Sequence, residues 1–285
     1  MLLFHAQPCG GILAACYLLV ASCGPLDNRD RTPSTKVEVV PGADGGYKLV
    51  HLVNGRPEGR ITLFRPDGSI GAIFYLHNDS LQGVQRHFYP DGKLKLWEEA
   101  EHDRLHGRSY KWYPNGNLAT IRQMQAGLRT GRFLEYYAAP TNQLRTRAEY
   151  VVVDGKEWEN GYILYDSLGR ITDCWGFPQV YADHDTIALG DSLTLHLRVR
   201  SPKEPLVLAA IGPFDEQFRL HDSDKLRVIY GQNHQVTISV PVSQRGPQVA
   251  RGYLADYKPD PKEQQKGVTG TLERQMYFAY PYYVR

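Results

Sequence analysis

The chain has 285 residues, enough for two domains of ordinary size. Its 33 Lys and Arg residues nearly balance its 31 Asp and Glu residues, and the two signs alternate along the chain, which excludes nucleic acid as a partner. The 19 Tyr residues outnumber the 9 Phe and 4 Trp, and 27 Gly accompany them. This composition is typical of β structure with many turns.

An apolar segment begins the chain. The first 23 residues contain no Asp, Glu, Lys or Arg, and the run from Gly10 to Ser22 is shorter than the roughly 20 residues that span a membrane. Such a run is typical of a signal peptide, and it ends in VASC at residues 20–23, which resembles the bacterial lipobox. We therefore predict a lipoprotein signal peptide over residues 1–22 and lipidation of Cys23, which anchors the protein in the membrane. The alternative is an apolar N-terminus that is poorly cleaved.

A polar segment follows the predicted anchor. Residues 24–46 include Pro25, Pro33 and Pro41, a composition typical of a linker. We expect residues 23–46 to form the lipid anchor and a tether. Gly24 is not the Asp associated with retention in the inner membrane, so we expect the outer membrane of a bacterial envelope.

A repeat occupies the middle of the chain. Glycines recur every 24 residues at Gly59, Gly83, Gly107 and Gly131, and a looser copy starts at Gly161. Within the copies, a Pro-(Asp/Asn)-Gly turn recurs at the same period, as at residues 66–68, 90–92 and 114–116. This turn predicts a three-residue hairpin loop with the Gly at positive φ. The fourth copy has a longer loop at residues 138–143.

The hairpin loop also predicts cross-strand pairs. Counting outward from each turn places an aromatic residue opposite an aliphatic one, and we expect each aromatic on the core side of the sheet. The predicted pairs are Phe64 with Ile70, Phe88 with Leu94, Trp112 with Leu118, and Tyr165 with Ile171. Stacking of such hairpins predicts an antiparallel meander over residues 47–178.

The repeat segments carry a family resemblance. NGRPEGRITLFRPDGSI, DRLHGRSYKWYPNGNL and AGLRTGRFLEYY resemble MORN-variant repeats. The resemblance implies β-hairpin repeats that contact proteins or phospholipids. Chains of this type are often named as antitoxin components of toxin–antitoxin systems.

Period-two strands fill the rest of the chain. SLTLHLRV at residues 192–199 and VTISVPV at residues 236–242 each place apolar side chains on one face. At least six such strands, separated by Pro, Gly and Asp turns, predict an immunoglobulin-like β-sandwich over residues 179–285. The whole chain is therefore expected to be all-β.

One row of residues is a candidate binding site. Tyr89, Tyr113 and Tyr137 each follow the aromatic residue of a predicted pair, so strand alternation places them on the opposite face. Such a row could bind a protein, a glycan or lipid headgroups, or could pack beneath a covering layer.

We find no catalytic motif, metal-ligand spacing or cofactor motif in the sequence. The sequence thus favours a non-catalytic envelope lipoprotein that binds or scaffolds through its repeats, without metal or cofactor. The alternative is an antitoxin-like or immunity protein that neutralises a toxin.

Overall fold

The computed structural model describes residues 33–199, 206–231, 233–259 and 270–285. The predicted signal peptide and Cys23 lie outside the described residues. Strands dominate these ranges, with one short 3-10 helix, η1 (Ser223–Lys225). Across the same ranges, no helix is long and apolar enough to cross a membrane. The all-β expectation is confirmed.

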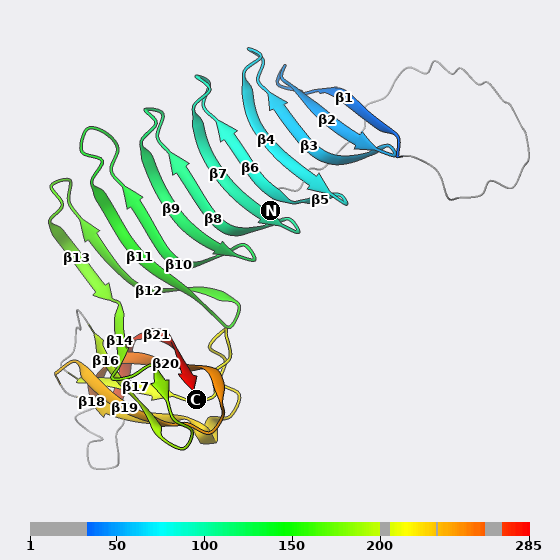
Figure 1. The fold of residues 1–285 in the computed structure, drawn as a ribbon. Coiled ribbons are helices and arrows are strands. Elements are labelled where there is room, and N and C mark those ends of the chain that lie inside the picture. Colours follow the sequence, from blue (N-terminus) through cyan, green and yellow to red (C-terminus); the bar gives the residue numbers. More distant parts are fainter. Residues whose placement is uncertain (1–32, 200–205, 232, 260–269) are drawn as a thin grey trace, which may run out of the picture. The chain divides into compact units, whose positions relative to one another are not determined.

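The repeats form one 13-stranded antiparallel sheet in which each strand pairs with its neighbours in sequence, apart from β5, which pairs with β4 alone (Figure 1). The strands are β1 (Thr35–Pro41), β2 (Tyr47–Val53), β3 (Arg56–Phe64), β4 (Ile70–His77), β5 (Ser80–Leu81), β6 (Gly83–Phe88), β7 (Leu94–Glu101), β8 (Arg104–Trp112), β9 (Leu118–Gln125), β10 (Leu128–Tyr136), β11 (Leu144–Val153), β12 (Lys156–Tyr165) and β13 (Ile171–Gly176). The predicted meander of hairpins is confirmed.

The predicted turn chemistry explains the hairpins. In the turn after β6, the N–H of Tyr89 donates to the carbonyl of Lys93 at 2.8 Å, and the N–H of Gly92 donates back to the carbonyl of Tyr89 at 2.9 Å. Gly92 has a φ of 82°, a conformation that glycine adopts without strain. All four predicted cross-strand pairs are present in the strand register. At the opposite ends of the strands, two-residue turns such as Asn54-Gly55 connect one hairpin to the next. Both residues of this turn have positive φ, as type I′ turns require.

The sheet begins earlier than expected. Strand β1 lies inside the segment expected to be a tether, and it pairs with β2 along its whole length. The connecting turn repeats the same geometry, because the N–H of Gly42 donates to the carbonyl of Gly46 and the N–H of Gly45 donates to that of Gly42. Residues 35–41 are therefore part of the repeat sheet.

The paired aromatic residues are less buried than expected. Phe64, Phe88 and Trp112 are each only partly buried. The physical reason is that, among the described strands, this sheet is a single layer over most of its length, so no second layer of them excludes water from the side on which these rings lie (Figure 1). The expectation that they form a closed core was wrong.

The C-terminal strands form two further sheets, ordered β14-β16-β19 and β15-β21-β20-β17-β18. Their bounds are β14 (Pro178–Ala182), β15 (Thr186–Ile187), β16 (Ser192–Val199), β17 (Leu206–Ile211), β18 (Arg227–Gly231), β19 (Gln235–Pro241), β20 (Gly246–Pro259) and β21 (Gly270–Val284). Named A, A′, B, C, C′, E, F and G in chain order, they make sheets A-B-E and A′-G-F-C-C′, which is an immunoglobulin-like arrangement. One core joins both sheets, and the alternating residues of β16 and β19, such as Leu195 and Ile238, are fully buried in it.

The last repeat hairpin contributes to the core of the sandwich. Trp175 of β13 is 7% exposed and belongs to that core, and Tyr162 of β12 packs against it. Nearby, Asn160 is 1% exposed, and its side-chain amide forms hydrogen bonds with the backbone of β21 as a neighbouring strand would. Its Nδ2 donates to the carbonyl of Tyr277 at 2.8 Å, and its Oδ1 accepts the N–H of Tyr277 at 2.6 Å. The repeat sheet and the sandwich are thus joined by packing and by hydrogen bonds.

Asn160→Leu should destabilise the protein strongly, because it leaves a buried backbone N–H and a buried carbonyl of Tyr277 unpaired. Each unpaired group costs about 1–3 kcal/mol of unfolding free energy. Chemical denaturation followed by circular dichroism measures the loss. Asn115→Leu is the control, because the exposed Asn115 side chain accepts one N–H at a turn that water can solvate. Equal losses in the two variants would contradict the role given to Asn160.

Candidate functional site

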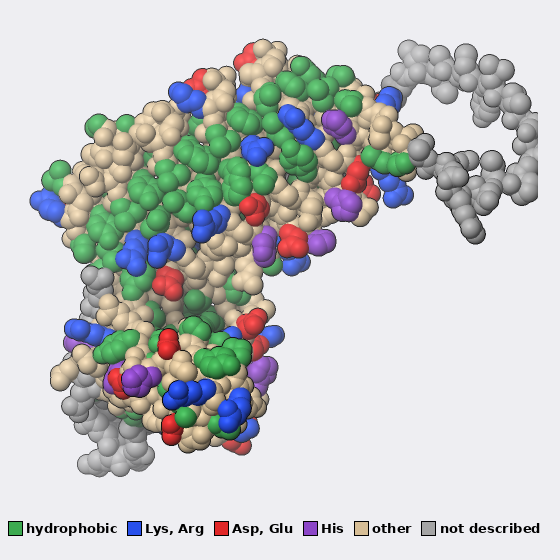
Figure 2. All heavy atoms as spheres, viewed as in Figure 1, with side chains coloured by type: hydrophobic (Ala, Val, Ile, Leu, Met, Phe, Trp, Pro, Cys, Tyr) green, Lys and Arg blue, Asp and Glu red, His purple; other side chains and the backbone are tan. Residues whose placement is uncertain are grey.

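One side of the repeat sheet carries a row of aromatic rings, which we call the aromatic face. Strand register places on this side Tyr47, Phe64, Phe88, Trp97, Tyr110, Trp112, Tyr136 and Tyr165. Neighbouring rings touch: the centroids of Trp97 and Tyr110 are 5.5 Å apart, and those of Tyr110 and Trp112 are 6.0 Å apart. Figure 2 shows hydrophobic side chains gathered in a band across this sheet.

Arginine side chains share the aromatic face. Arg86 lies opposite Trp97, and the Nη1 of Arg108 donates to the hydroxyl of Tyr110 at 3.4 Å. Arg60, Arg108 and Arg132 are exposed and each directly follows the glycine that opens a repeat. Basic side chains lie along the hydrophobic band in Figure 2. The face therefore offers aromatic rings and guanidinium groups together.

The far end of this face has a small pocket of about 210 Å³ between β10 and β11. Arg132 and Arg147 line it together with Glu149 and Phe177. Burial raises the pKa of Glu149, and the two arginines oppose this shift. Arg147 also lies over the ring of Phe177, at 5.1 Å from its centroid.

The predicted tyrosine row, Tyr89, Tyr113 and Tyr137, links each hairpin to the next. The hydroxyl of Tyr89 donates to the carbonyl of Trp112 at 2.7 Å, and that of Tyr113 donates to the carbonyl of Tyr136 at 2.8 Å. The hydroxyl of Tyr137 donates in the same way to the carbonyl of Tyr165 at 2.9 Å. One hairpin earlier, Arg65 takes the equivalent place and donates to the carbonyl of Phe88.

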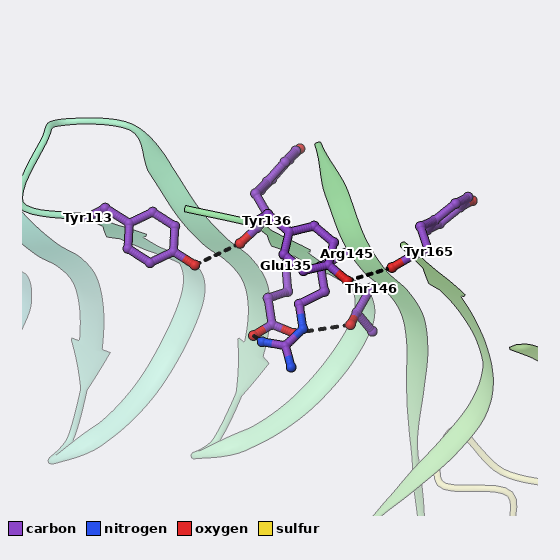
Figure 3. Close-up of polar contacts among 7 residues, drawn as sticks. Tyr113, Glu135, Tyr136, Arg145, Thr146 and Tyr165 are labelled. Atoms are coloured by element: carbon purple, nitrogen blue, oxygen red, sulfur yellow. Dashed lines mark hydrogen bonds and ion pairs between the residues drawn. The ribbon is translucent and has the colours of Figure 1, made fainter. Parts of the chain in front are cut away.

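Figure 3 shows how the tyrosine row relates to the aromatic face. The rings of Tyr136 and Tyr165 point to one side, whereas the ring of Tyr113 lies along the sheet toward the next hairpin. All three rings of the row are partly buried. Of the two roles that the sequence left open, these contacts favour packing between hairpins. A ligand-binding role for the row stays a prediction.

A polar cluster lies on the side opposite the aromatic face. Glu98, only 7% exposed, accepts from Nη2 of Arg122 at 2.5 Å and from Oγ of Ser109 at 3.1 Å. Because the carboxylate is paired and hydrogen-bonded, it holds β7, β8 and β9 together. Within the described ranges, no three His, Cys, Asp or Glu side chains lie close enough to hold a metal ion.

Sequence reasoning missed the aromatic face because it treated these rings as core. Two signals were present. Strand alternation places Trp97 and Tyr110 on the same side as the predicted pair residue Trp112. Arginine also recurs after the repeat glycine at positions 60, 108 and 132, which marks that side as solvent-exposed.

Tyr113→Phe tests the linking role of the tyrosine row. The change removes one hydroxyl and its bond to the next hairpin, so unfolding free energy should fall by about 0.5–1.5 kcal/mol. The triple variant with Tyr89→Phe and Tyr137→Phe should lose about three times as much. Thermal and chemical unfolding measure the effect.

Tyr75→Phe is the matched control for this series, because Tyr75 is partly buried in the same sheet and its hydroxyl makes no hydrogen bond within the described protein. If the two single variants unfold alike, the hydroxyl bonds do not link the hairpins.

Comparison with known families supports the nature of the repeats. Residues 81–96 and 105–125 match the MORN repeat variant family. These segments fall in β5 to β9, in the middle of the repeat sheet. None of the curated proteins compared matches the chain. The hairpins of this region are thus similar to MORN repeat variants, and the same turn geometry continues on both sides of them.

Proposed function

We propose that this protein is a non-catalytic, lipid-anchored protein of the bacterial envelope that binds another protein through its aromatic face. The observation that carries the proposal is the contiguous set of Trp97, Tyr110 and Trp112, partly exposed and bordered by Arg86 and Arg108. A MORN repeat module is consistent with such a binding or scaffolding role.

The chemistry of the face favours a protein partner. Trp, Tyr and Arg are the residues that contribute most often to the affinity of protein interfaces. Their rings supply contact area at low entropic cost. A broad, single-layer sheet also offers a large surface, whereas small-molecule ligands are usually held in concave pockets.

The envelope location rests on the sequence. Cys23 follows a lipobox-like segment, and 10 residues separate it from Ser34, where the compact part of the chain begins. Fully extended, that segment spans at most about 40 Å. The repeat sheet would therefore act close to the membrane, which we propose is the outer membrane. The alternative of an antitoxin-like or immunity protein stays a prediction, and it would present the same face to a toxin.

Charge reversal on the aromatic face should abolish binding. Arg60→Glu with Arg108→Glu changes two exposed side chains, so folding should be retained, while capture of a partner from detergent-solubilised envelopes should fall at least about tenfold. Quantitative pull-down against the wild-type protein measures the loss.

Lys95→Glu with Lys111→Glu is the control for charge reversal. It causes the same change in net charge, and Lys111 lies on the other side of β8 from Tyr110 while Lys95 lies over the ring of Tyr89. This control should keep the partner. Equal capture by both double variants would reject the aromatic face as the binding surface.

The anchor is tested separately. Cys23→Ala removes the predicted lipidation site, so the protein should leave the membrane fraction and lose incorporation of radiolabelled palmitate. Cys174→Ala, a change within the repeat sheet, should leave partition unaltered. Unchanged membrane partition of Cys23→Ala would refute the lipoprotein proposal while leaving the aromatic face untouched.

A further inference from the structure

Strand β1 ends the repeat sheet with an open edge. It pairs with β2 on one side, and no described strand pairs with its other side. The carbonyl of Ser34 accepts the N–H of Asn54, so even-numbered residues of β1 direct their backbone groups toward β2. Because these directions alternate along a strand, Thr35, Val37 and Val39 direct their N–H and carbonyl groups outward.

The side chains of this edge are exposed and apolar on one face. Val37 is 51% exposed and Val39 is 61% exposed. Register with β2 places both on the side of Leu49, which is the side of the aromatic face, while Lys36 and Glu38 lie on the opposite side. An open edge with exposed valines is able to pair with another strand.

The sequence of the edge is symmetric about Val37. Lys36 and Glu38 flank it, Thr35 and Val39 come next, and Pro33 and Pro41 close the segment at equal distances. Both prolines fall at positions whose backbone would face outward, and proline has no N–H to donate. If another strand paired with this edge in a ladder centred on Val37, the ladder would therefore end at Pro33 on one side and at Pro41 on the other.

From this symmetry we propose that β1 pairs antiparallel with β1 of a second copy of this chain, around a two-fold axis at Val37. In this register Val37 faces itself, and Thr35 faces Val39 of the other copy. These residues form the hydrogen-bonded pairs of an antiparallel ladder. The outward N–H groups of Thr35, Val37 and Val39 all then find carbonyl partners.

Charge selects this register over its neighbours. Centred on Val37, each Lys36 lies opposite Glu38 of the other copy, in non-hydrogen-bonded pairs where side chains come closest. Moving the axis by one residue places Lys36 against Lys36 or Glu38 against Glu38, and like charges directly opposite are destabilising. Moving the axis by two residues, to Thr35 or Val39, places Val37 opposite Pro33 or Pro41. Proline has no N–H to donate, so a hydrogen bond of the ladder is lost.

A cysteine placed on the axis tests the pairing in the full-length protein in detergent. In a hydrogen-bonded pair the two Cα atoms are about 5.5 Å apart, which suits a disulfide. Val37→Cys should therefore form a cross-linked dimer under mild oxidation, well above the wild-type background on non-reducing gels. Val39→Cys is the control, because it is more exposed but faces Thr35 and lies more than 10 Å from its own copy.

A charge swap provides the second test. Lys36→Glu alone should shift the protein to monomer in sedimentation velocity, because Glu then faces Glu. Lys36→Glu combined with Glu38→Lys should restore the dimer. The proposal is overturned if Val37→Cys cross-links no better than Val39→Cys, or if the single and swapped variants have the same mass.

Discussion

Backbone hydrogen bonding between neighbouring hairpins is the interaction on which the repeat sheet depends. The sheet is a single layer over most of its length, so burial of apolar area cannot supply the whole of its stability. Glycines at positive φ allow each turn to close without strain, as at Gly92 and Gly116. Side chains then reinforce the ladder, because the tyrosine row and the pair of Glu98 with Arg122 connect one hairpin to the next.

An open sheet of this kind must end somewhere, and its two ends differ. At the C-terminal end, Trp175 enters the core of the sandwich, and Asn160 satisfies the backbone of β21. That end is covered and anchored. At the N-terminal end, β1 has backbone groups that no other described strand pairs with, and two exposed valines. The contrast follows from repeat architecture, in which each unit contacts its neighbours and the terminal units need a cap or a partner.

The two sides of the sheet also differ in how their side chains are used. The polar cluster and the tyrosine row satisfy their own hydrogen-bonding groups within the sheet. The aromatic face keeps its rings and guanidinium groups partly exposed, and it is the surface to which we assign the proposed binding of a partner. A binding surface on a rigid scaffold loses little conformational entropy when a partner docks.

On its own, the sequence determined the hairpins, because the Pro-Asp-Gly turn and the alternating strands on either side of it depend only on residues close together in the chain. It predicted the pairing of Trp112 with Leu118 and the buried alternation of β16. It missed β1, because Gly45 lies 23 residues before Gly68 and lacks the usual proline. Tertiary structure alone decided the exposure of Trp112, the carbonyls bound by the tyrosine row and the contact of Asn160 with Tyr277, 117 residues away. Burial and hydrogen-bond partners depend on what lies against a face, and that is set by contacts between residues far apart in the chain.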